Sequence, residues 1–333
     1  MIIKPRHLEK GDKIGIISPS SSIKDFPKRT KRGILQLERM GFQVVISPNT
    51  FAKQGPIAGS SEQRAEDLNA FFEDEDIKAI ICSTGGYNSN AILPLIDYNL
   101  IKKNPKIICG YSDITAVLCA VHKKTGLITF HGPTLLPSFG EFGGLLDFTK
   151  QNFEKVLMTP RAIGMLQRPR EYTSEFLIWE CEDNRKRKMR QTKPWMALNT
   201  GVAEGAIIGG NTETLLTLVG TEFFPELRNK LLFLEDETLD IGRIVRDITH
   251  LEQIGVFDTV CGVVYARSAL TDANKLSKLF YETLREIGEN HQIPVLVNVD
   301  FGHTDPRLIL PIGIKAKLDA NQRTISIPYA ATI

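Results

Sequence analysis

The sequence has no uninterrupted apolar run near the roughly 18–20 residues that a membrane-spanning helix requires. Its N-terminal stretch, MIIKPRHLEKGDKIGIISPS, lacks the long apolar region and small-residue cleavage site of a signal peptide. The net charge is only +2, so no excess of charge points to nucleic acid or to an acidic membrane surface. These absences predict a cytoplasmic protein that binds neither a nucleic-acid polymer nor a membrane.

Cysteine is also scarce, with five residues in 333 and no C-x-x-C pair. This pattern excludes a disulfide framework and a zinc ribbon. Histidine, cysteine and carboxylate residues do not cluster at metal-ligand spacing. Neither G-x-G-x-x-G nor a Walker sequence is present, so we expect no metal and no cofactor.

The first half of the chain alternates apolar, strand-like runs with helical patterns. One such unit begins with Ser60 and Gln63, which are spaced for a capping box, and continues into a strand over residues 77–82. Alternation of this kind predicts an α/β fold with a mostly parallel sheet and helices on both faces. The periodicity weakens between residues 137 and 169, and the β-rich runs that follow predict a smaller α+β domain.

Ser112 lies where a predicted strand meets a predicted helix. The apolar run 107–109 stops at Gly110, and a helical pattern begins after Asp113. A nucleophile elbow places serine on such a turn. A helix N-cap also favours serine, and Ile114 replaces the final glycine of the usual G-x-S-x-G elbow. The residues alone leave both roles open.

A nucleophilic serine needs a base, and the base needs an orienting carboxylate. His303 follows the apolar strand 294–299, and strand-end loops often present catalytic side chains. His131 is a second strand-end candidate. Glu235 is the first polar residue after the apolar run 231–234. A structural histidine and a solvated acidic turn are the alternative interpretations.

The motif STGGYNSN places Gly85 and Gly86 at another strand end, ahead of a helical segment. Backbone N–H groups at such a turn can donate to an oxyanion, although a purely structural turn fits as well. The carboxyl ends of parallel strands meet at one edge of a sheet. We therefore expect Ser18, Gly86 and Ser112 to line one crevice.

The segment from residue 182 to 195, EDNRKRKMRQTKPW, is dense in charge. It fits either a solvated, mobile loop or a lid whose cations attract an anionic ligand.

Motifs spread over nearly the whole chain resemble the LD-carboxypeptidase family of serine peptidases. Each is weak alone, but all occur in the family's order: GDKIGIISPSS, STGGYNSN, ICGYSDITAVL, FHGPTL, GGNTETLLTLVGT, LLFLEDE and FGHTDPRLILPIG. The resemblance implies a Rossmann-like domain over residues 1–165 and a smaller β-rich domain over residues 166–333. The active site would lie between them, in a protein that forms a homodimer.

The resemblance also implies roles for individual residues. Ser112 would be the nucleophile, His303 the base and Glu235 its orienting carboxylate. The backbone N–H groups of Gly86 and Asp113 would form the oxyanion hole. These are the residues that strand-end reasoning selects independently.

Residues 171–195 resemble an insertion found in the MccF-type members, which give immunity to microcin C. In that subgroup aromatic side chains of this region stack on a nucleobase, which implies Trp179 as the stacking residue and Tyr172 or Phe176 as a second wall. A packed hydrophobic anchor is the alternative for Trp179.

The expected partner is therefore a small molecule. We also expect Gly85 and Asn211 to contact it. The resemblance favours an aminoacyl- or peptidyl-nucleotide as substrate. A murein tetrapeptide substrate, and a non-catalytic protein that sequesters a toxin or nucleotide, are the alternatives.

Overall fold

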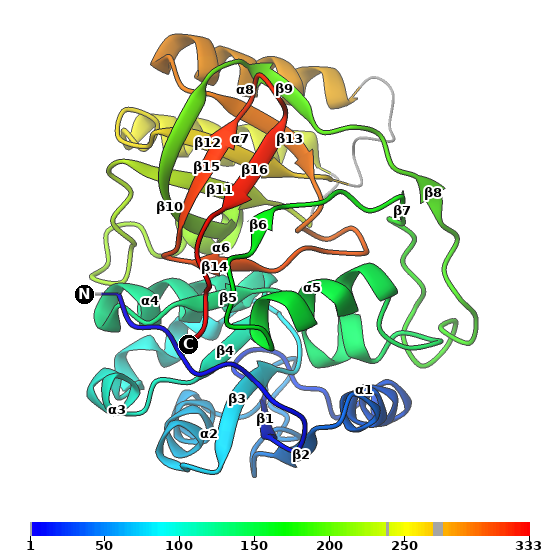
Figure 1. Cartoon of the computed structure of the whole chain (residues 1–333). Coiled ribbons are helices and arrows are strands. Elements are labelled where there is room, and N and C mark those ends of the chain that lie inside the picture. The colour runs from blue at the N-terminus through cyan, green and yellow to red at the C-terminus, as the bar shows by residue number, and fades with distance from the viewer. Residues whose placement is uncertain (1, 238–239, 269–275) are drawn as a thin grey trace.

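The computed structural model describes residues 2–237, 240–268 and 276–333. Two sheets with flanking helices lie one above the other, the N-terminal half below and the C-terminal half above (Figure 1). The chain ends meet near the junction, where the backbone N–H of His7 donates to the carbonyl of Ile333 at 2.9 Å. No helix among the described residues is long and apolar enough to cross a membrane.

The first sheet has the strand order β14-β5-β4-β3-β1-β2. Neighbouring strands from β5 to β2 pair in parallel, as the sequence predicts, whereas β14 pairs antiparallel with β5. The strands are β1 (Lys13–Ile17), β2 (Gln43–Ile46), β3 (Ile77–Cys82), β4 (Ile107–Gly110), β5 (Thr129–His131) and β14 (Leu310–Ile312). The helices of this half are α1 (Pro27–Arg39), α2 (Ser61–Glu73), α3 (Tyr98–Lys103), α4 (Thr115–Thr125) and α5 (Asp147–Leu157), with short turns η1 (Ser89–Leu95), η2 (Ser112–Ile114) and η3 (Leu135–Phe139).

The second sheet has the order β6-β16-β15-β10-β11-β12-β13-β9. Its centre, from β10 to β13, is parallel, and antiparallel strands flank it. The strands are β6 (Gly164–Met165), β9 (Met196–Asn199), β10 (Val202–Asn211), β11 (Lys230–Glu235), β12 (Gly262–Ala266), β13 (Val295–Val299), β15 (Lys315–Asp319) and β16 (Thr324–Ile327). The helices are α6 (Thr212–Leu216), α7 (Ile241–Gln253) and α8 (Leu276–His291); the strands β7 (Glu171–Tyr172) and β8 (Arg190–Gln191) form a separate ribbon.

This arrangement confirms the predicted α/β fold with a largely parallel sheet. The boundary at residue 165 stays a prediction, and β14 shows that the chain returns to the first sheet between strands β13 and β15 of the second. The helix start that the sequence predicts at Ser60 is also confirmed. Ser60 accepts from the backbone N–H of Gln63 and Gln63 caps in return, so the predicted capping box starts α2.

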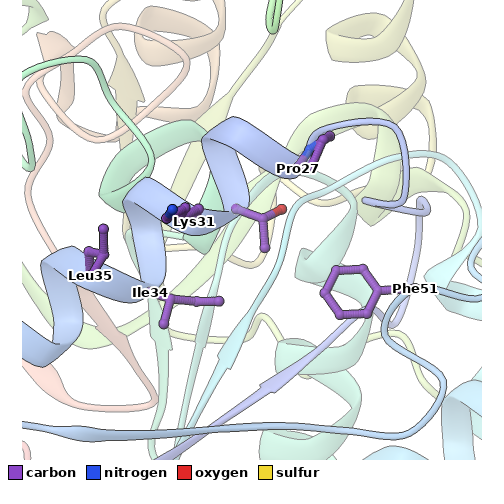
Figure 2. Close-up of a pocket in the computed structure, with 6 residues that line it drawn as sticks. Pro27, Lys31, Ile34, Leu35 and Phe51 are labelled. Atoms are coloured by element: carbon purple, nitrogen blue, oxygen red, sulfur yellow. The ribbon is translucent and has the colours of Figure 1, made fainter.

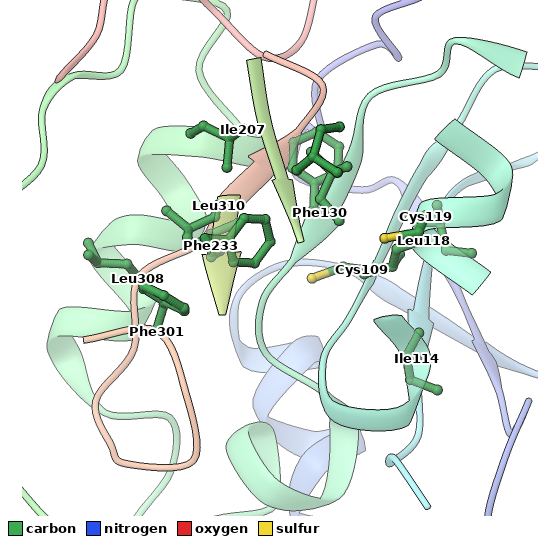
Figure 3. Packing of buried hydrophobic residues seen from close by; sticks show 14 of the residues in the cluster. Cys109, Ile114, Leu118, Cys119, Phe130, Ile207, Phe233, Phe301, Leu308 and Leu310 are labelled. Atoms are coloured by element: carbon green, nitrogen blue, oxygen red, sulfur yellow. The ribbon is translucent and has the colours of Figure 1, made fainter. Parts of the chain in front are cut away.

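One hydrophobic core joins the two sheets. Phe130 of β5 packs in the same cluster as Ile207 of β10 and Phe233 of β11 (Figure 3). Phe301, in the loop after β13, belongs to it as well, with its ring centroid 5.5 Å from that of Phe233. Close packing of this kind resists relative movement, so the loops at the junction are held in a fixed relation to one another.

Candidate active site

Ser112 begins the tight turn between β4 and α4. Its φ is +62°, in the left-handed region that L-residues other than asparagine and aspartate rarely adopt. The residue before it, Tyr111, is extended, and neither η2 nor α4 has a side-chain cap hydrogen bond at its N-cap position. The N-cap interpretation of Ser112 is therefore wrong, because the N-cap positions are Tyr111 and Ile114. A strained turn of this kind is the backbone feature of a nucleophile elbow.

The glycine turn after β3 lies directly against Ser112. A Cβ built on Gly85 would be 2.8 Å from Ser112 Cβ and 2.9 Å from its Oγ. Gly86 has a φ of +149°, and a Cβ there would overlap the hydroxyl groups of Ser20 and Ser21. The approach of the three strand-end loops thus depends on both glycines lacking a side chain.

Asp113 binds these loops together through its buried carboxylate. Its Oδ2 accepts from Ser20 Oγ at 2.5 Å and from the backbone N–H of Ser89 at 2.7 Å. Ser18, which directly follows β1, is also buried, and its hydroxyl is 2.7 Å from that of Ser83. The sequence identified the Asp113 backbone but not this use of its side chain. The serines that follow β1 in the sequence were the signal that could have indicated hydrogen-bond donors for this carboxylate.

Glu235 and His303 form a close pair on the second sheet. His303 Nδ1 lies 2.5 Å from Glu235 Oε2, and Glu235, the last residue of β11, is fully buried. Gly302 allows this approach, since a Cβ there would be 3.1 Å from Glu235 Cβ and 2.8 Å from Ala266 Cβ. Thr212 Oγ1 donates to the carbonyl of Glu235 at 3.1 Å and holds the end of the strand.

Each member of the pair changes the pKa of the other. Burial acts to lower the pKa of His303, but the charge of Glu235 and the hydrogen bond to it outweigh burial, so the pKa is raised. Burial likewise acts to raise the pKa of Glu235, and His303 reverses this, so the pKa falls below its usual value. The pair therefore favours an imidazolium beside a carboxylate, the state that a general base reaches after accepting a proton.

Two contacts connect this pair to the Ser112 turn. The ring of Tyr111, the residue before Ser112, lies 5.0 Å from the ring of His303. On the other side of the turn, Thr115 Oγ1 accepts from the backbone N–H of Asn211 at 2.9 Å. Asn211 is the register partner of Glu235 across β10 and β11. The predicted nucleophile, base and carboxylate thus come from loops that touch at the junction of the two sheets.

His131, the second histidine candidate, has a different environment. It is fully buried, and its Nε2 lies 3.0 Å from the carbonyl of Phe301. Burial lowers the pKa of His131 to about 4, so the ring is neutral at physiological pH. These features fit a structural histidine that supports the loop carrying His303.

The predicted ligand-contacting side chains lie in several environments. Trp179 is half-buried, with its ring edge-on to Phe26 at 5.2 Å and the Arg29 guanidinium 4.8 Å from its centroid. Tyr172 is buried and lies 4.7 Å from the Arg267 guanidinium. Their contacts to a ligand stay predictions, as do those of Gly85 and Asn211.

Asn211 caps α6 by accepting from the backbone N–H of Thr214 at 3.0 Å. Phe176, 71% exposed, is the most open aromatic side chain of the insertion.

A separate cavity of about 270 Å³, between α1 and Phe51, shares no lining residue with this site (Figure 2). Within the described ranges, no three histidine, cysteine or carboxylate side chains are grouped to hold a metal ion.

Fold and site together define an α/β protein with a serine elbow on one sheet and a histidine–carboxylate pair on the other. Residues 14–132 match the LD-carboxypeptidase N-terminal domain and residues 204–318 the LD-carboxypeptidase C-terminal domain. The chain belongs to the LD-carboxypeptidase family.

The relatives in this family include both a microcin self-immunity protein and a murein carboxypeptidase. The microcin C7 self-immunity protein MccF of Escherichia coli is 38% identical over 96% of this chain and 94% of its own. The murein tetrapeptide carboxypeptidase of Pseudomonas aeruginosa is 26% identical over 93% of this chain and 94% of its own. Among solved structures, MccF in complex with aspartyl sulfamoyl adenosine has a TM-score of 0.92 at 36% identity, covering 99% of this chain and 100% of that one.

Proposed function

We propose that this protein is a serine hydrolase of the MccF type that cleaves the amide bond of aminoacyl- or peptidyl-nucleotides. The proposal rests on the geometry of the site at the junction of the two sheets. Ser112 occupies a left-handed turn with Gly85 against its side chain, and Tyr111 contacts the histidine of the His303–Glu235 pair.

In this mechanism Ser112 Oγ attacks the acyl carbonyl while His303 Nε2 accepts its proton. Glu235 fixes the tautomer through Nδ1–H and stabilises the imidazolium. Backbone N–H groups of Gly86 and Asp113 donate to the oxyanion. His303 then protonates the leaving nitrogen, the C–N bond breaks, and water hydrolyses the acyl-enzyme to release the acid and free Ser112.

The nucleotide portion of the substrate is inferred from the insertion and from the relatives. Solved structures of MccF contain aspartyl sulfamoyl adenosine or glutamyl sulfamoyl guanosine, and an MccF-like protein of Streptococcus pneumoniae contains AMP. Here the insertion offers Trp179 and the exposed Phe176, whose ring centroids are 6.1 Å apart. Aromatic rings stack on any nucleobase. Cleavage of such a molecule would confer immunity to a microcin C-like antibiotic.

A murein tetrapeptide is the second candidate substrate, because relatives that match nearly the whole chain are murein peptide carboxypeptidases. The chemistry would be the same, with a terminal D-Ala as the leaving amine. We also propose that the enzyme works in the cytoplasm as a homodimer. Sedimentation velocity would test the oligomeric state and cell fractionation the location.

Mass spectrometry of purified enzyme with aspartyl sulfamoyl adenosine and, separately, a murein tetrapeptide tests the proposal. We expect hydrolysis of the nucleotide compound, loss of that hydrolysis in Ser112→Ala, and a covalent adduct at Ser112 with a serine-reactive phosphonate. Cleavage of the tetrapeptide alone would refute the proposed substrate. Tight nucleotide binding without turnover or adduct would instead indicate a sequestering protein.

A further inference from the structure

Six charged side chains form a continuous network between the insertion and the loop that carries His303; five are buried, and the Arg187 side chain is 14% exposed. Three are cations and three are carboxylates, and the more exposed Arg32 adds a fourth cation through its ion pair with Asp183. We call the six the arginine–carboxylate network: Arg29, Glu141, Asp183, Arg187, Asp305 and Arg307.

Asp305, two residues after His303, is the end of the network nearest the active site. Its Oδ2 accepts from Arg187 Nη2 at 2.9 Å, and its Oδ1 accepts from Arg307 Nε at 3.0 Å. Both guanidinium groups oppose the effect of burial and hold the pKa of Asp305 at about 2. The backbone of Asp305 pairs with Thr173 of the insertion through two hydrogen bonds, at 2.6 and 3.0 Å. The insertion thus holds this loop by both main chain and side chain.

Arg307 extends the network to the nucleophile turn. Its guanidinium lies 3.8 Å from the centroid of the Tyr111 ring, and the same ring lies 5.0 Å from His303. Tyr111 directly precedes Ser112. A displacement of Asp305 would therefore move Arg307 and disturb the aromatic contact between the serine turn and the histidine.

The other end of the network lies under the predicted nucleobase-stacking residue. Glu141 Oε2 bridges Arg187 at 3.0 Å and Arg29 at 3.1 Å, and Arg29 also contacts Asp183 at 3.0 Å. The Arg29 guanidinium is the group that lies 4.8 Å from the Trp179 ring. Arg187 is the link between the two ends, because it alone contacts both Glu141 and Asp305 within the described network.

A buried charge cannot leave its partner without a large desolvation penalty, so the members of such a network move together or not at all. We propose that Arg187 is a positioning residue that couples the nucleotide-binding insertion to the base, His303. This rests on the proposed function. Arg187 sets the position of the His303 loop, so its loss lowers the rate of the chemical step more than it weakens nucleotide binding.

Arg187→Gln tests this, with Arg185→Gln as the matched control. Arg185 lies two residues away on the same insertion, but its side chain is 46% exposed and its ion pair is with Glu175. We expect Arg187→Gln to reduce kcat, and the rate of phosphonate labelling of Ser112, at least about 10-fold. The Kd for AMP should change by less than about 3-fold. Arg185→Gln should match the wild type in all three.

Two more variants keep the test decisive if Arg187→Gln does not fold. Arg187→Lys keeps the charge and should recover some of the rate. Arg187→Gln combined with Glu141→Gln keeps the net charge of the wild-type network, and we expect it to fold but to keep the low kcat. The downfield Nδ1 proton resonance of His303 should shift in this double variant and not in Arg185→Gln.

The outcomes separate the two proposals. A wild-type protein that hydrolyses neither substrate and is not labelled at Ser112 would refute the proposed function. An active wild-type enzyme whose folded Arg187 variants keep its kcat, labelling rate and His303 resonance would refute the positioning role alone.

Discussion

The left-handed conformation of Ser112 predicts an unusual order of stability between two variants that lack its hydroxyl group. At most positions within helices, a glycine variant has a free energy of unfolding about 1 kcal/mol lower than the alanine variant, because glycine loses more backbone entropy on folding. At a φ of +62° the order reverses, since alanine would have the steric conflict of an L-residue in the left-handed region and glycine would not. Ser112→Gly should therefore be more stable than Ser112→Ala.

The size of the effect follows from two opposing contributions. The left-handed conformation costs an L-residue roughly 1–2 kcal/mol, and glycine loses about 0.5–1 kcal/mol more in backbone entropy than alanine. The difference leaves Ser112→Gly about 1 kcal/mol more stable. For a protein of this size, that corresponds to a rise in Tm of about 2 °C.

Urea unfolding of the two variants, followed by tryptophan fluorescence, measures the difference. Neither variant has the serine hydroxyl, so catalysis does not affect the comparison. Gln151, exposed in the middle of α5, provides the control. There Gln151→Gly should be about 1 kcal/mol less stable than Gln151→Ala. If Ser112→Gly were also the less stable of its pair, the turn would not be strained and the elbow interpretation would fail.

Three further predictions follow from the site. Glu235→Gln should lower activity by roughly 10³–10⁴-fold and move the acid limb of kcat/KM to lower pH, since Glu235 raises the pKa of His303; an unmoved limb in the residual activity would argue against the pairing. Gly86→Ala should reduce kcat by about 10²-fold or more because its Cβ meets two serine hydroxyls, whereas Gly220→Ala, at a φ of +78° in open space, should keep wild-type kinetics. Burial, reinforced by Glu235, raises the pKa of Asp236 to about 8, so wild-type stability should fall as pH rises from about 4 through 8; Asp236→Asn should lack this component in urea unfolding at pH 5 and 8.

Features with local causes could be predicted from the sequence. An apolar run ending in polar residues located β3 at residues 77–82, and Ser60 with Gln63 located the start of α2. The same logic selected Ser112, Glu235 and His303, because a polar residue that follows a buried strand is exposed at the edge of a sheet. Their catalytic roles remain predictions that the geometry supports.

Features that depend on contacts between distant residues could not be predicted in this way. The charged segment from residue 182 to 195 was consistent with a solvated loop, yet Asp183 is 5% exposed and Arg187 reaches Asp305, 118 residues away. Arginine and aspartate are usually exposed, and only their partners show that Asp183 is buried and that most of the Arg187 side chain is removed from solvent. The antiparallel strand β14 was missed for the same reason, because its partner β5 lies in the other half of the chain.

The departure of the serine turn from the G-x-S-x-G pattern has a physical cause in the packing around Gly110. A Cβ on Gly110 would lie 2.7 Å from Ile114 Cγ2, so the absence of a side chain at the first position makes room for a large one at the last. Ile114 is fully buried and fills that space. The single glycine at position 110 is therefore enough to let the two ends of the turn approach each other closely. Asp113 adds the restraint from the neighbouring loops, which keeps Ser112 in its left-handed conformation without a second glycine.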